Sequence, residues 1–412
     1  MLFFIASSIS LLFLISGFIV FLFGIHYTKK NNNPTIPISN DHPRFAVLIP
    51  ARDESRVISG LLESIAGQTR SVSMQDVYVI VEQESDPTIA IARKYQAQVI
   101  VRRHLDQKGK GYALQEALTA IFANHQNYDA YFIFDADNIL DKNFIMEMEK
   151  TYRRGYDIGI GYRNCKNGNS NWIASCSTLT FSLLNTIMNR KRIKYQANVI
   201  ISGTGYFIKG DIVSKWQGFP FHTLTEDYEL TLYSILNGYK TYYNEEACYY
   251  DEQPTTYYQS RVQRTRWIRG YFDARKIYVP QIRHSIHQND RNIGSKKAEV
   301  LGVIPYILMV IGLILWLLIN VIEVFVNPST QLKWLFVINL IGMCLFAYVI
   351  LYLVTLVIII KEKKLNLKDS AKWKALLLHP FFLVTYISCA IRALFMKERV
   401  WEKIEHKEVE IK

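Results

Sequence analysis

Apolar residues are concentrated at the two ends of this 412-residue chain. Residues 2–26 contain no Lys, Arg, Asp or Glu, and three more apolar segments cover about 299–326, 334–361 and 371–396. About 20 mainly apolar residues are enough for a helix to cross a bilayer. The first segment lacks the basic start and the small-residue cleavage site of a secretory signal peptide, which is the alternative interpretation. We therefore expect a retained transmembrane helix over 1–28.

The last of the three carboxyl-terminal segments is less regular than the other two. It contains Pro380 and Arg392, so we expect it to be kinked, re-entrant or packed inside a helix bundle. The positive-inside rule places the region after Lys29 in the cytoplasm. The basic stretches at 361–368 and 397–412 favour the same side, and a re-entrant segment reconciles them with one orientation. The pattern predicts a multi-pass membrane protein with a cytoplasmic middle domain.

The formal net charge of +12 does not indicate a nucleic-acid-binding protein. The cations are dispersed, and no basic nucleic-acid-binding motif is present. Cytoplasmic Lys and Arg beside anionic lipid headgroups explain such a charge in a membrane protein. The five cysteines form no Cys-x-x-Cys pair, which argues against a disulfide framework and against structural zinc. We expect a reducing compartment, membrane lipids as partners and no nucleic acid.

Between the apolar ends, strand patterns alternate with helix patterns. This alternation predicts an α/β fold with a mostly parallel sheet and helices on both faces. The predicted strands cover 45–50, 77–82, 97–101 and 130–134, and the predicted helices cover 57–65 and 112–122. Farther along, we expect strands at 157–162 and 199–207, a helix at 172–188, a hairpin at 239–250 and an Arg-rich helix at 257–275.

These patterns divide the chain into six parts. They are a transmembrane helix (1–28), a linker (29–43), a cytoplasmic α/β domain (44–255), interfacial helices (256–298), about three transmembrane segments (299–396) and a basic tail (397–412).

The strand at 130–134 ends in Asp135-Ala136-Asp137. Open α/β sheets bind ligands at the carboxyl ends of their strands. Two neighbouring carboxylates repel each other unless a cation lies between them, and their hard oxygens suit Mg²⁺ or Mn²⁺ carrying a diphosphate. The motif predicts a metal-dependent nucleotide-sugar site, although an ordinary acidic loop after a strand explains the same three residues.

Four motifs follow one another along the chain. They are Lys108-Gly-Lys110-Gly, Asp135-Ala-Asp137, Thr225-Glu-Asp227 and Gln263-Arg-Thr-Arg266-Trp267. In this order they resemble the membrane-embedded family 2 glycosyltransferases, which include cellulose, hyaluronan and poly-N-acetylglucosamine synthases. The QxxRW pattern is the most discriminating, because it follows DxD and TED and precedes the apolar segments. The resemblance covers about residues 44–275 and implies a GT-A-type nucleotide-sugar-binding domain.

The resemblance also implies a role for each acidic motif. Asp227 resembles the family's catalytic aspartate and is the candidate base that takes the acceptor proton. Asp137 is the candidate metal ligand, with Asp135 on the nucleotide side, and Lys110 matches the family's nucleotide-contacting lysine. An N-cap with acidic residues in the first helical turn is the alternative for Thr225-Glu-Asp, and a solvated surface lysine is the alternative for Lys110.

The remaining candidates lie on the acceptor and nucleoside sides. Glu226, Gln263, Arg266 and Trp267 are the expected acceptor and diphosphate residues, with Arg266 neutralising the diphosphate and Trp267 offering a flat surface to a sugar. An interfacial Arg-rich helix with Trp at the headgroup level is the alternative.

Glu54 resembles the family's acidic residue near the uridine, and a supporting role in its own helix is the alternative. Glu82 stands where the family usually has an aspartate in a DDGS-like turn. Its side chain is one methylene longer, and the glycine of that turn is absent.

The resemblance implies an inverting transferase that uses a UDP-sugar to build and export a β-linked polysaccharide. Transfer of a single sugar to a lipid carrier or glycolipid is the alternative. A non-catalytic membrane component that kept the fold is a third hypothesis, which the presence of every required acidic residue disfavours. The compact chain, without plant-type insertions, favours a bacterial source.

Overall fold

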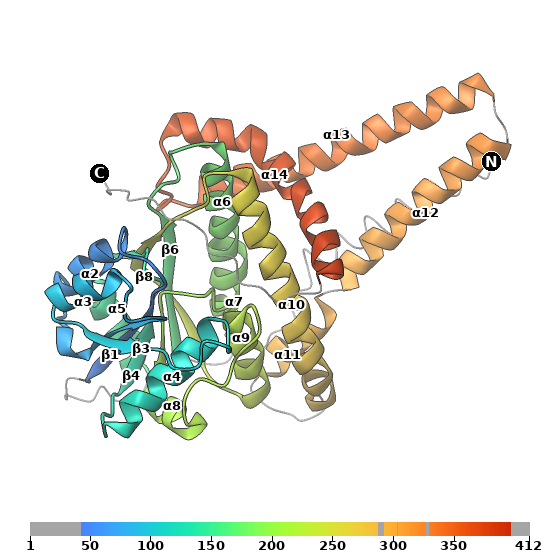
Figure 1. The fold of residues 1–412 in the computed structure, drawn as a ribbon. Helices are drawn as coiled ribbons and strands as arrows, with labels where there is room; N and C mark the ends of the chain where they lie inside the picture. Colours follow the sequence, from blue (N-terminus) through green and yellow to red (C-terminus); the bar gives the residue numbers. More distant parts are fainter. Residues whose placement is uncertain (1–42, 287–291, 303, 327–328, 397–412) are drawn as a thin grey trace.

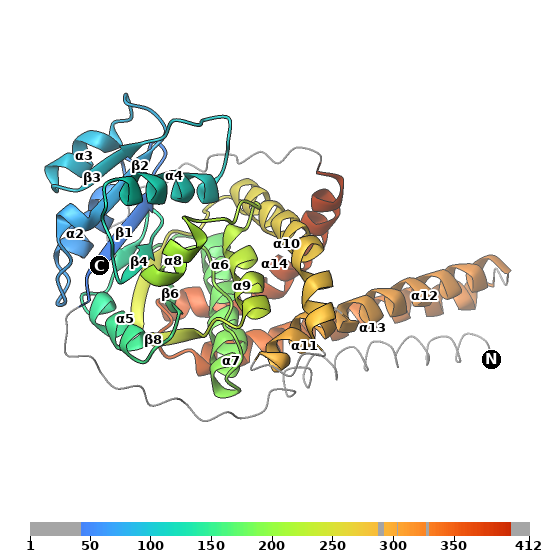
Figure 2. The same cartoon turned by 90° about the horizontal axis from the view of Figure 1, so that it is seen from below.

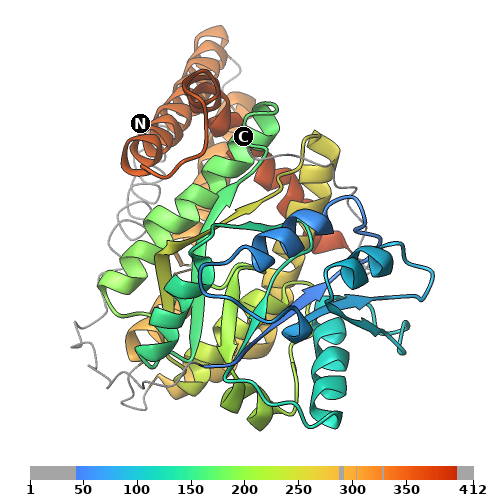
Figure 3. The same ribbon diagram turned by 90° about the vertical axis from the view of Figure 1, so that its left-hand side faces the viewer.

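The computed structural model describes residues 43–286, 292–302, 304–326 and 329–396. It shows an α/β domain built on one eight-stranded sheet and two long helices that project away from it (Figure 1). These are α12 (Ile304–Val326) and α13 (Thr330–Lys361). Figure 1 shows that they meet at their far end and spread apart toward the domain, Figure 2 shows one in front of the other, and Figure 3 shows them foreshortened at the upper edge of the domain. The predicted helix at 1–28 and the basic tail at 397–412 lie outside the described residues.

The first half of the sheet is parallel, as the strand and helix alternation predicts. Its strands are β1 (Phe45–Pro50), β2 (Val77–Val81), β3 (Gln98–Val101) and β4 (Ala130–Ile133), in the order β3-β2-β1-β4. Side chains alternate between the two faces of a strand. Val47 and Ile49 therefore pack in one buried cluster, and Ala46 and Leu48 pack in the other.

Helices cover both faces of this half. α2 (Ile58–Ala66), α3 (Thr88–Lys94) and α5 (Phe144–Arg153) contribute to the first cluster, and α4 (Lys110–Ala123) contributes to the second. The carboxyl ends of the parallel strands consequently open onto one edge of the domain, which carries Asp135.

The second half of the sheet is mixed, so the expectation of a mostly parallel sheet is wrong there. β7 (Tyr206–Lys209) pairs antiparallel with both β4 and β6 (Ile158–Cys165). β8 (Thr241–Asp251) pairs parallel with β6, and β5 (Ile139–Leu140) pairs antiparallel with β8. Parallel and antiparallel strands that are buried on both faces have the same apolar pattern, so local sequence does not distinguish them.

Two local predictions in this region are also wrong. Residues 239–250 do not form a hairpin, because β8 is a single strand of 11 residues. Its register with β6 shifts between Gly161 and Tyr162, and the irregular stretch near Asn244 has the polar composition of a turn. The strand expected at 199–207 is confined to Tyr206–Lys209.

The remaining helices connect the sheet to the carboxyl-terminal part. They are α6 (Trp172–Leu183), a π-helix (Leu184–Asn189), α7 (Arg190–Lys194), α8 (Gly210–Trp216), α9 (Glu226–Asn237), α10 (Tyr257–Ser285), α11 (Ile293–Leu301) and α14 (Asp369–Phe395). The Arg-rich helix α10 continues ten residues beyond its predicted end at 275 and includes Pro280.

Two helices in the described part of the chain are long and apolar enough to cross a membrane. They cover Lys333–Lys361 and Asp369–Phe395, and a shorter apolar helix covers Val310–Val326. These criteria are length and composition alone, so they weakly suggest membrane association and do not establish a multi-pass topology.

The connection between α13 and α14 packs against the α/β domain. The buried Glu362 side chain accepts hydrogen bonds from Thr186 and pairs with Arg190 at 2.8 Å. Asn366 donates to the Cys165 carbonyl at 3.0 Å, and Lys364 pairs with Glu246 at 3.0 Å. These polar contacts attach the apolar helices to the domain at a defined place.

The close approach of α4 to the loop before α9 gives a stability prediction. A Cβ atom on Gly111, in the first turn of α4, would lie 1.8 Å from the Phe221 carbonyl oxygen. Two main-chain segments would have to separate, so Gly111→Ala should destabilise the protein by about 1–3 kcal/mol. The melting midpoint measured in detergent tests this.

Gly60→Ala, in α2, is the matched control, because its Cβ would make only ordinary contacts with Ile139 at 3.5 Å. Equal midpoints for the two variants would contradict the close packing of α4 against Phe221.

Candidate active site

Lys110 joins three segments at the carboxyl edge of the sheet. Its Nζ donates to an oxygen of Asp135, directly after β4, and to the Gly203 carbonyl at 2.7 Å. Burial opposes the charge on Lys110, but the carboxylates of Asp135, Glu226 and Asp227 outweigh that effect and raise its pKa. The lysine is therefore an ion-paired residue of the site, and the interpretation of a solvated surface lysine does not describe it.

The loop at Gly203-Thr204-Gly205 depends on glycine at two positions. Gly203 and Gly205 have φ angles of +78° and +68°, which side-chain-bearing residues rarely adopt. A Cβ atom on Gly203 would lie 3.4 Å from an Asp227 carboxylate oxygen. Between the two glycines, the Thr204 hydroxyl accepts a hydrogen bond from the Asp135 main chain at 2.8 Å. The loop thus brings the Asp135 and Asp227 segments together.

Glu226 and Asp227 are neighbouring carboxyl groups in the first turn of α9, where Glu226 is buried and Asp227 is half-buried. Thr225 precedes them without a side-chain capping bond, so capping does not account for this motif. Burial and the charge of Asp227 raise the pKa of Glu226 to about 7. Burial likewise raises the pKa of Asp227. The hydrogen bond that its carboxylate accepts from the Tyr228 main chain and the charges of Lys110 and Arg266 act in the opposite direction and favour the ionised form.

Arg266 of α10 faces the same carboxylates. Burial lowers its pKa, while Glu226, Asp135 and Asp227 favour its charged form. α10 can lie this close to α9 because position 270 is glycine, where a Cβ would be 2.4 Å from the Thr225 hydroxyl. The structure thus brings together five of the predicted residues, namely Lys110, Asp135, Glu226, Asp227 and Arg266.

Gln263 and Trp267 lie beside Arg266 on α10 and are half-buried. The Trp267 ring meets the Phe181 ring of α6 edge-on, with the ring centroids 5.6 Å apart. One side of the indole therefore packs within the protein.

Glu54 and Glu82 lie at the same edge, after β1 and β2. Glu82 pairs with Arg52 at 3.0 Å and with Arg102 at 3.6 Å. The Glu54 main chain donates to the Thr88 hydroxyl at 3.0 Å. Glu54 follows β1, the neighbour of β4, and Glu82 follows β2, one strand farther away, where guanidinium groups hold it.

A buried polar network supports Asp137. Its carboxylate accepts hydrogen bonds from Asn138 at 3.3 Å and from the Glu252 main chain at 3.2 Å. Asn138 also donates to Asp251 at 3.1 Å, and Asp251 forms an ion pair with Arg163. Burial is the largest cause that raises the pKa of Asp251 to about 7, against the opposing charge of Arg163.

Asn138, Arg163 and Asp251 belong to this network and were not predicted from the sequence. Asn138 directly follows the Asp135-Ala-Asp137 motif, so its position was a usable signal. Asp251 ends β8, which was expected to be part of a hairpin. Parallel pairing of β6 and β8 places Arg163 and Asp251 close together, and that pairing is not visible in local sequence.

Asp135 and Asp137 fit a cation that takes most of its ligands from elsewhere. Among the described residues, no group of three or more His, Cys, Asp or Glu side chains could hold a metal ion. Two carboxylates, with phosphate and water oxygens as the remaining ligands, match the coordination of Mg²⁺ in nucleotide enzymes.

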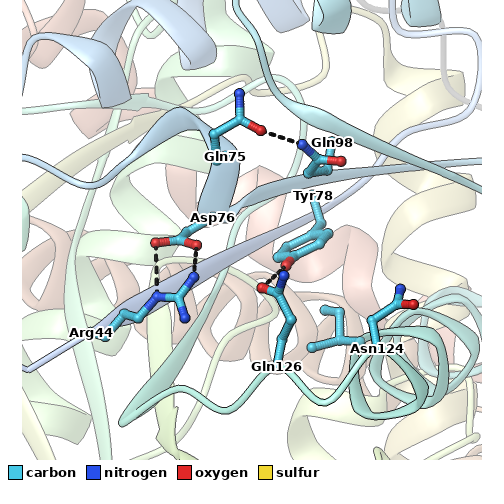
Figure 4. Close-up of a pocket in the computed structure, with 8 residues that line it drawn as sticks. Arg44, Gln75, Asp76, Tyr78, Gln98, Asn124 and Gln126 are labelled. Carbon is cyan, nitrogen blue, oxygen red and sulfur yellow. Dashed lines mark hydrogen bonds and ion pairs between the residues drawn. The ribbon is translucent and has the colours of Figure 1, made fainter.

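A cavity of about 200 Å³ lies at the opposite, amino-terminal edge of the sheet (Figure 4). Its polar lining is largely paired internally, because Arg44 binds Asp76 at 2.6 Å and Tyr78 bonds to Gln126 at 3.0 Å. This cavity is therefore separate from the residues around Asp135.

Comparisons with known proteins identify the family and the fold. A sequence model of the family described as "Glycosyltransferase like family 2" matches residues 42–270, more than half of the chain. The probable glycosyltransferase YdaM of Bacillus subtilis is 28% identical over 244 residues, which are 55% of this chain and 55% of YdaM. The chain thus spans about half the length of this curated relative.

A solved structure shares the fold. The mannosyltransferase PcManGT of Pyrobaculum calidifontis, in complex with GDP-Man and Mn²⁺, aligns with a TM-score of 0.58 and 15% identity over 95% of this chain and all of that one. At this identity the likeness shows a GT-A-like α/β fold.

The paired carboxyl groups predict a pH-dependent stability difference. The pKa of Glu226 is about 7 in the folded protein against an ordinary 4.5, so its ionisation destabilises the folded state as pH rises through that interval. Glu226→Gln should remove this loss, by about 1.4 kcal/mol for each unit by which the pKa is raised. Melting midpoints at about pH 5 should be similar, and at about pH 8 the variant should be more stable.

Glu84→Gln, at an exposed carboxylate, is the control and should shift the midpoint equally at both pH values. A Glu226→Gln difference that is the same at both pH values would contradict the raised pKa.

Proposed function

The chain belongs to the glycosyltransferase-like family 2, and from this premise we propose that it is a membrane-bound inverting transferase that uses a UDP-sugar to extend and export a β-linked polysaccharide. The observation that carries the proposal is the arrangement around Lys110, whose ammonium links Asp135 to the loop at Gly203 beside Asp227. This arrangement supports the proposal, because positive groups that suit a diphosphate and a carboxylate that suits a base lie at one edge of the sheet.

In the proposed reaction, the acceptor hydroxyl attacks the anomeric carbon and gives its proton to Asp227. Burial raises the pKa of this carboxyl group, which strengthens it as a base once it is ionised. Lys110 and Arg266 stabilise the negative charge that develops on the leaving nucleoside diphosphate. A single base and no covalent intermediate are sufficient for inversion.

We propose Mg²⁺ or Mn²⁺ as the cofactor, held by Asp137 with Asp135 beside it. When bound, the ion would offset negative charge on the leaving diphosphate. The Mn²⁺ in the complex of the Pyrobaculum mannosyltransferase supports this choice. Asn138 and the Glu252 main chain orient the Asp137 carboxylate through their hydrogen bonds.

Donor binding falls to residues at the ends of the first two strands. Glu54 and Glu82 are the proposed contacts to the nucleoside, with Glu82 held by Arg52 and Arg102. Gln263, Arg266, Trp267 and Glu226 form the proposed acceptor and diphosphate side. The structural relative binds GDP-Man, so the donor test below compares a GDP-sugar with UDP-sugars.

Transfer of one sugar to a lipid carrier or glycolipid is the second candidate function. A channel for a polysaccharide needs several helices around it, whereas a lipid acceptor needs only attachment of the enzyme to the membrane. Among the described residues, the apolar helices at Lys333–Lys361 and Asp369–Phe395 satisfy this simpler requirement. In both candidates the reaction takes place on the cytoplasmic side of a bacterial membrane.

Asp227→Asn should abolish turnover and spare UDP binding. The amide keeps the size of the side chain but cannot take the acceptor proton, so kcat should fall by about 10²–10⁴-fold. UDP release under saturating donor and calorimetric UDP binding measure the two effects. Asp211→Asn, at an exposed carboxylate on α8, is the control and should leave both unchanged. Unchanged turnover in Asp227→Asn would remove the base assignment.

Product length distinguishes the two candidate functions. Purified protein with Mg²⁺ should release UDP from one member of a panel of UDP-glucose, UDP-N-acetylglucosamine and GDP-mannose, and should form a polymer. Release of GDP from GDP-mannose, without release of UDP from either UDP-sugar, would reject a UDP-sugar as the donor. A lipid that carries one sugar as the sole product would reject the polysaccharide synthase and establish the second candidate.

A further inference from the structure

Helix α14 has one packed face and one exposed apolar face. Leu376, Phe382, Cys389 and Ala393 are buried on the packed face. The opposite face carries an apolar stripe at helical spacing, formed by Trp373, Leu377, Phe381, Val384, Ile387 and Ile391, each more than half exposed. We call these six residues the α14 stripe. Its composition is that of a surface covered by lipid or by another protein.

Both ends of α14 are attached to the α/β domain. At the start, the Lys368 main chain donates to Asn169 at 2.7 Å, in the loop after β6. At the end, Arg269 of α10 donates to the carbonyls of Ala393 at 3.3 Å and Met396 at 3.1 Å. Because α10 itself packs against α9 of the α/β domain, the first and last turns of α14 are both attached to one folded unit.

This attachment is incompatible with a membrane-crossing α14. Its 27 residues make a helix about 40 Å long, and a crossing would place its ends on opposite sides of a hydrocarbon core about 30 Å thick. Asn169 and Arg269 would then also lie on opposite sides. The domain that joins them would enter the membrane.

The middle of α14 leads to the same conclusion. Arg264 of α10 is buried beneath it and donates to the Thr385 hydroxyl at 2.7 Å. Arg264 also stacks on the Phe382 ring, 4.3 Å from its centroid. α10 runs beside α14 (Figure 1) and carries Arg261, Arg266 and Arg269 as well. Charged side chains of this density are not found along lipid-exposed spans.

We propose that α14 lies in the plane of the membrane surface, with the α14 stripe among the acyl chains of the leaflet that faces the α/β domain. Only α12 and α13 of the described helices then cross the bilayer. This proposal rests on the membrane attachment in the proposed function and adds the orientation of one helix. The exposed Lys374 and Arg392 lie at the edge of the stripe, where their charges reach anionic headgroups.

The orientation has a consequence for the site. α14 packs on α10, and α10 carries Arg266, so the active site is held at a fixed height above the lipid headgroups. The connection between α13 and α14, with Lys361, Lys363 and Lys364, lies on the same side as the α/β domain. These lysines then lie on the cytoplasmic side, as the positive-inside rule requires, and α14 does not have to cross the membrane.

Depth measurements by spin labelling test the proposal. Cys344 is the exposed cysteine among the five, so Cys344→Ala gives a background for single labels at Leu377→Cys, Val384→Cys and Ile391→Cys in lipid nanodiscs. Collisions with oxygen and with a water-soluble nickel complex report the depth of each label. Equal, shallow depths at all three positions are the expected result.

Ile338→Cys, Leu345→Cys and Leu353→Cys on α13 are the controls, and their depths should rise and then fall. Positions 377 and 391 are about 21 Å apart along a helix, so a crossing α14 would show a large depth change between them. That result would overturn the proposal, as would water exposure at all three α14 labels or spin coupling between two copies. Water exposure along α13 would instead reject the membrane attachment itself.

A variant that fails to keep the wild-type melting midpoint is replaced by a label at the neighbouring stripe residue, Phe381 or Ile387. The stripe offers six mainly exposed positions on one face, so the depth profile is measurable without altering the buried residues of α14.

Discussion

The site depends on the interaction of the Lys110 ammonium with the carboxylates around it. It lies among Asp135, Glu226 and Asp227, and each of these carboxylates raises its pKa. Removal of the lysine would leave these carboxylates without their counter-charge, which is strongly destabilising. The three segments that Lys110 joins begin α4, follow β4 and precede β7, so this lysine fixes the relative positions of distant parts of the chain.

α10 couples this site to the carboxyl-terminal helices. Residues two positions apart on a helix point to nearly opposite sides. Arg264 reaches Thr385 of α14, whereas the charge of Arg266 acts on Glu226, Asp135 and Asp227. The QxxRW segment therefore has a structural arginine and a site arginine within three residues. Gly270 completes the arrangement, because it allows α10 to approach Thr225 closely.

Much of the fold and half of the site were predictable from the sequence because they depend on local patterns. The strands β1, β2 and β4 and the helices α2 and α4 follow from apolar periodicity. The mixed half of the sheet was not predictable, since β6, β7 and β8 pair across distant parts of the chain. The ion pair between Arg163 and Asp251 forms because β6 lies beside β8, so it could not be predicted without that strand pairing. The apolar character of α14 was plain in the sequence, but its attachment at both ends depends on tertiary contacts.

The charges around Asp227 link donor binding to base strength. Lys110 and Arg266 favour the ionised form of Asp227, and burial opposes it. A donor diphosphate that pairs with the same two cations compensates part of their positive charge. The remaining effect of burial then raises the affinity of Asp227 for a proton at the stage when the acceptor hydroxyl must lose one. In the proposed reaction, Asp227 shares its cations with the leaving group and is therefore a stronger base in the donor complex than in the free enzyme.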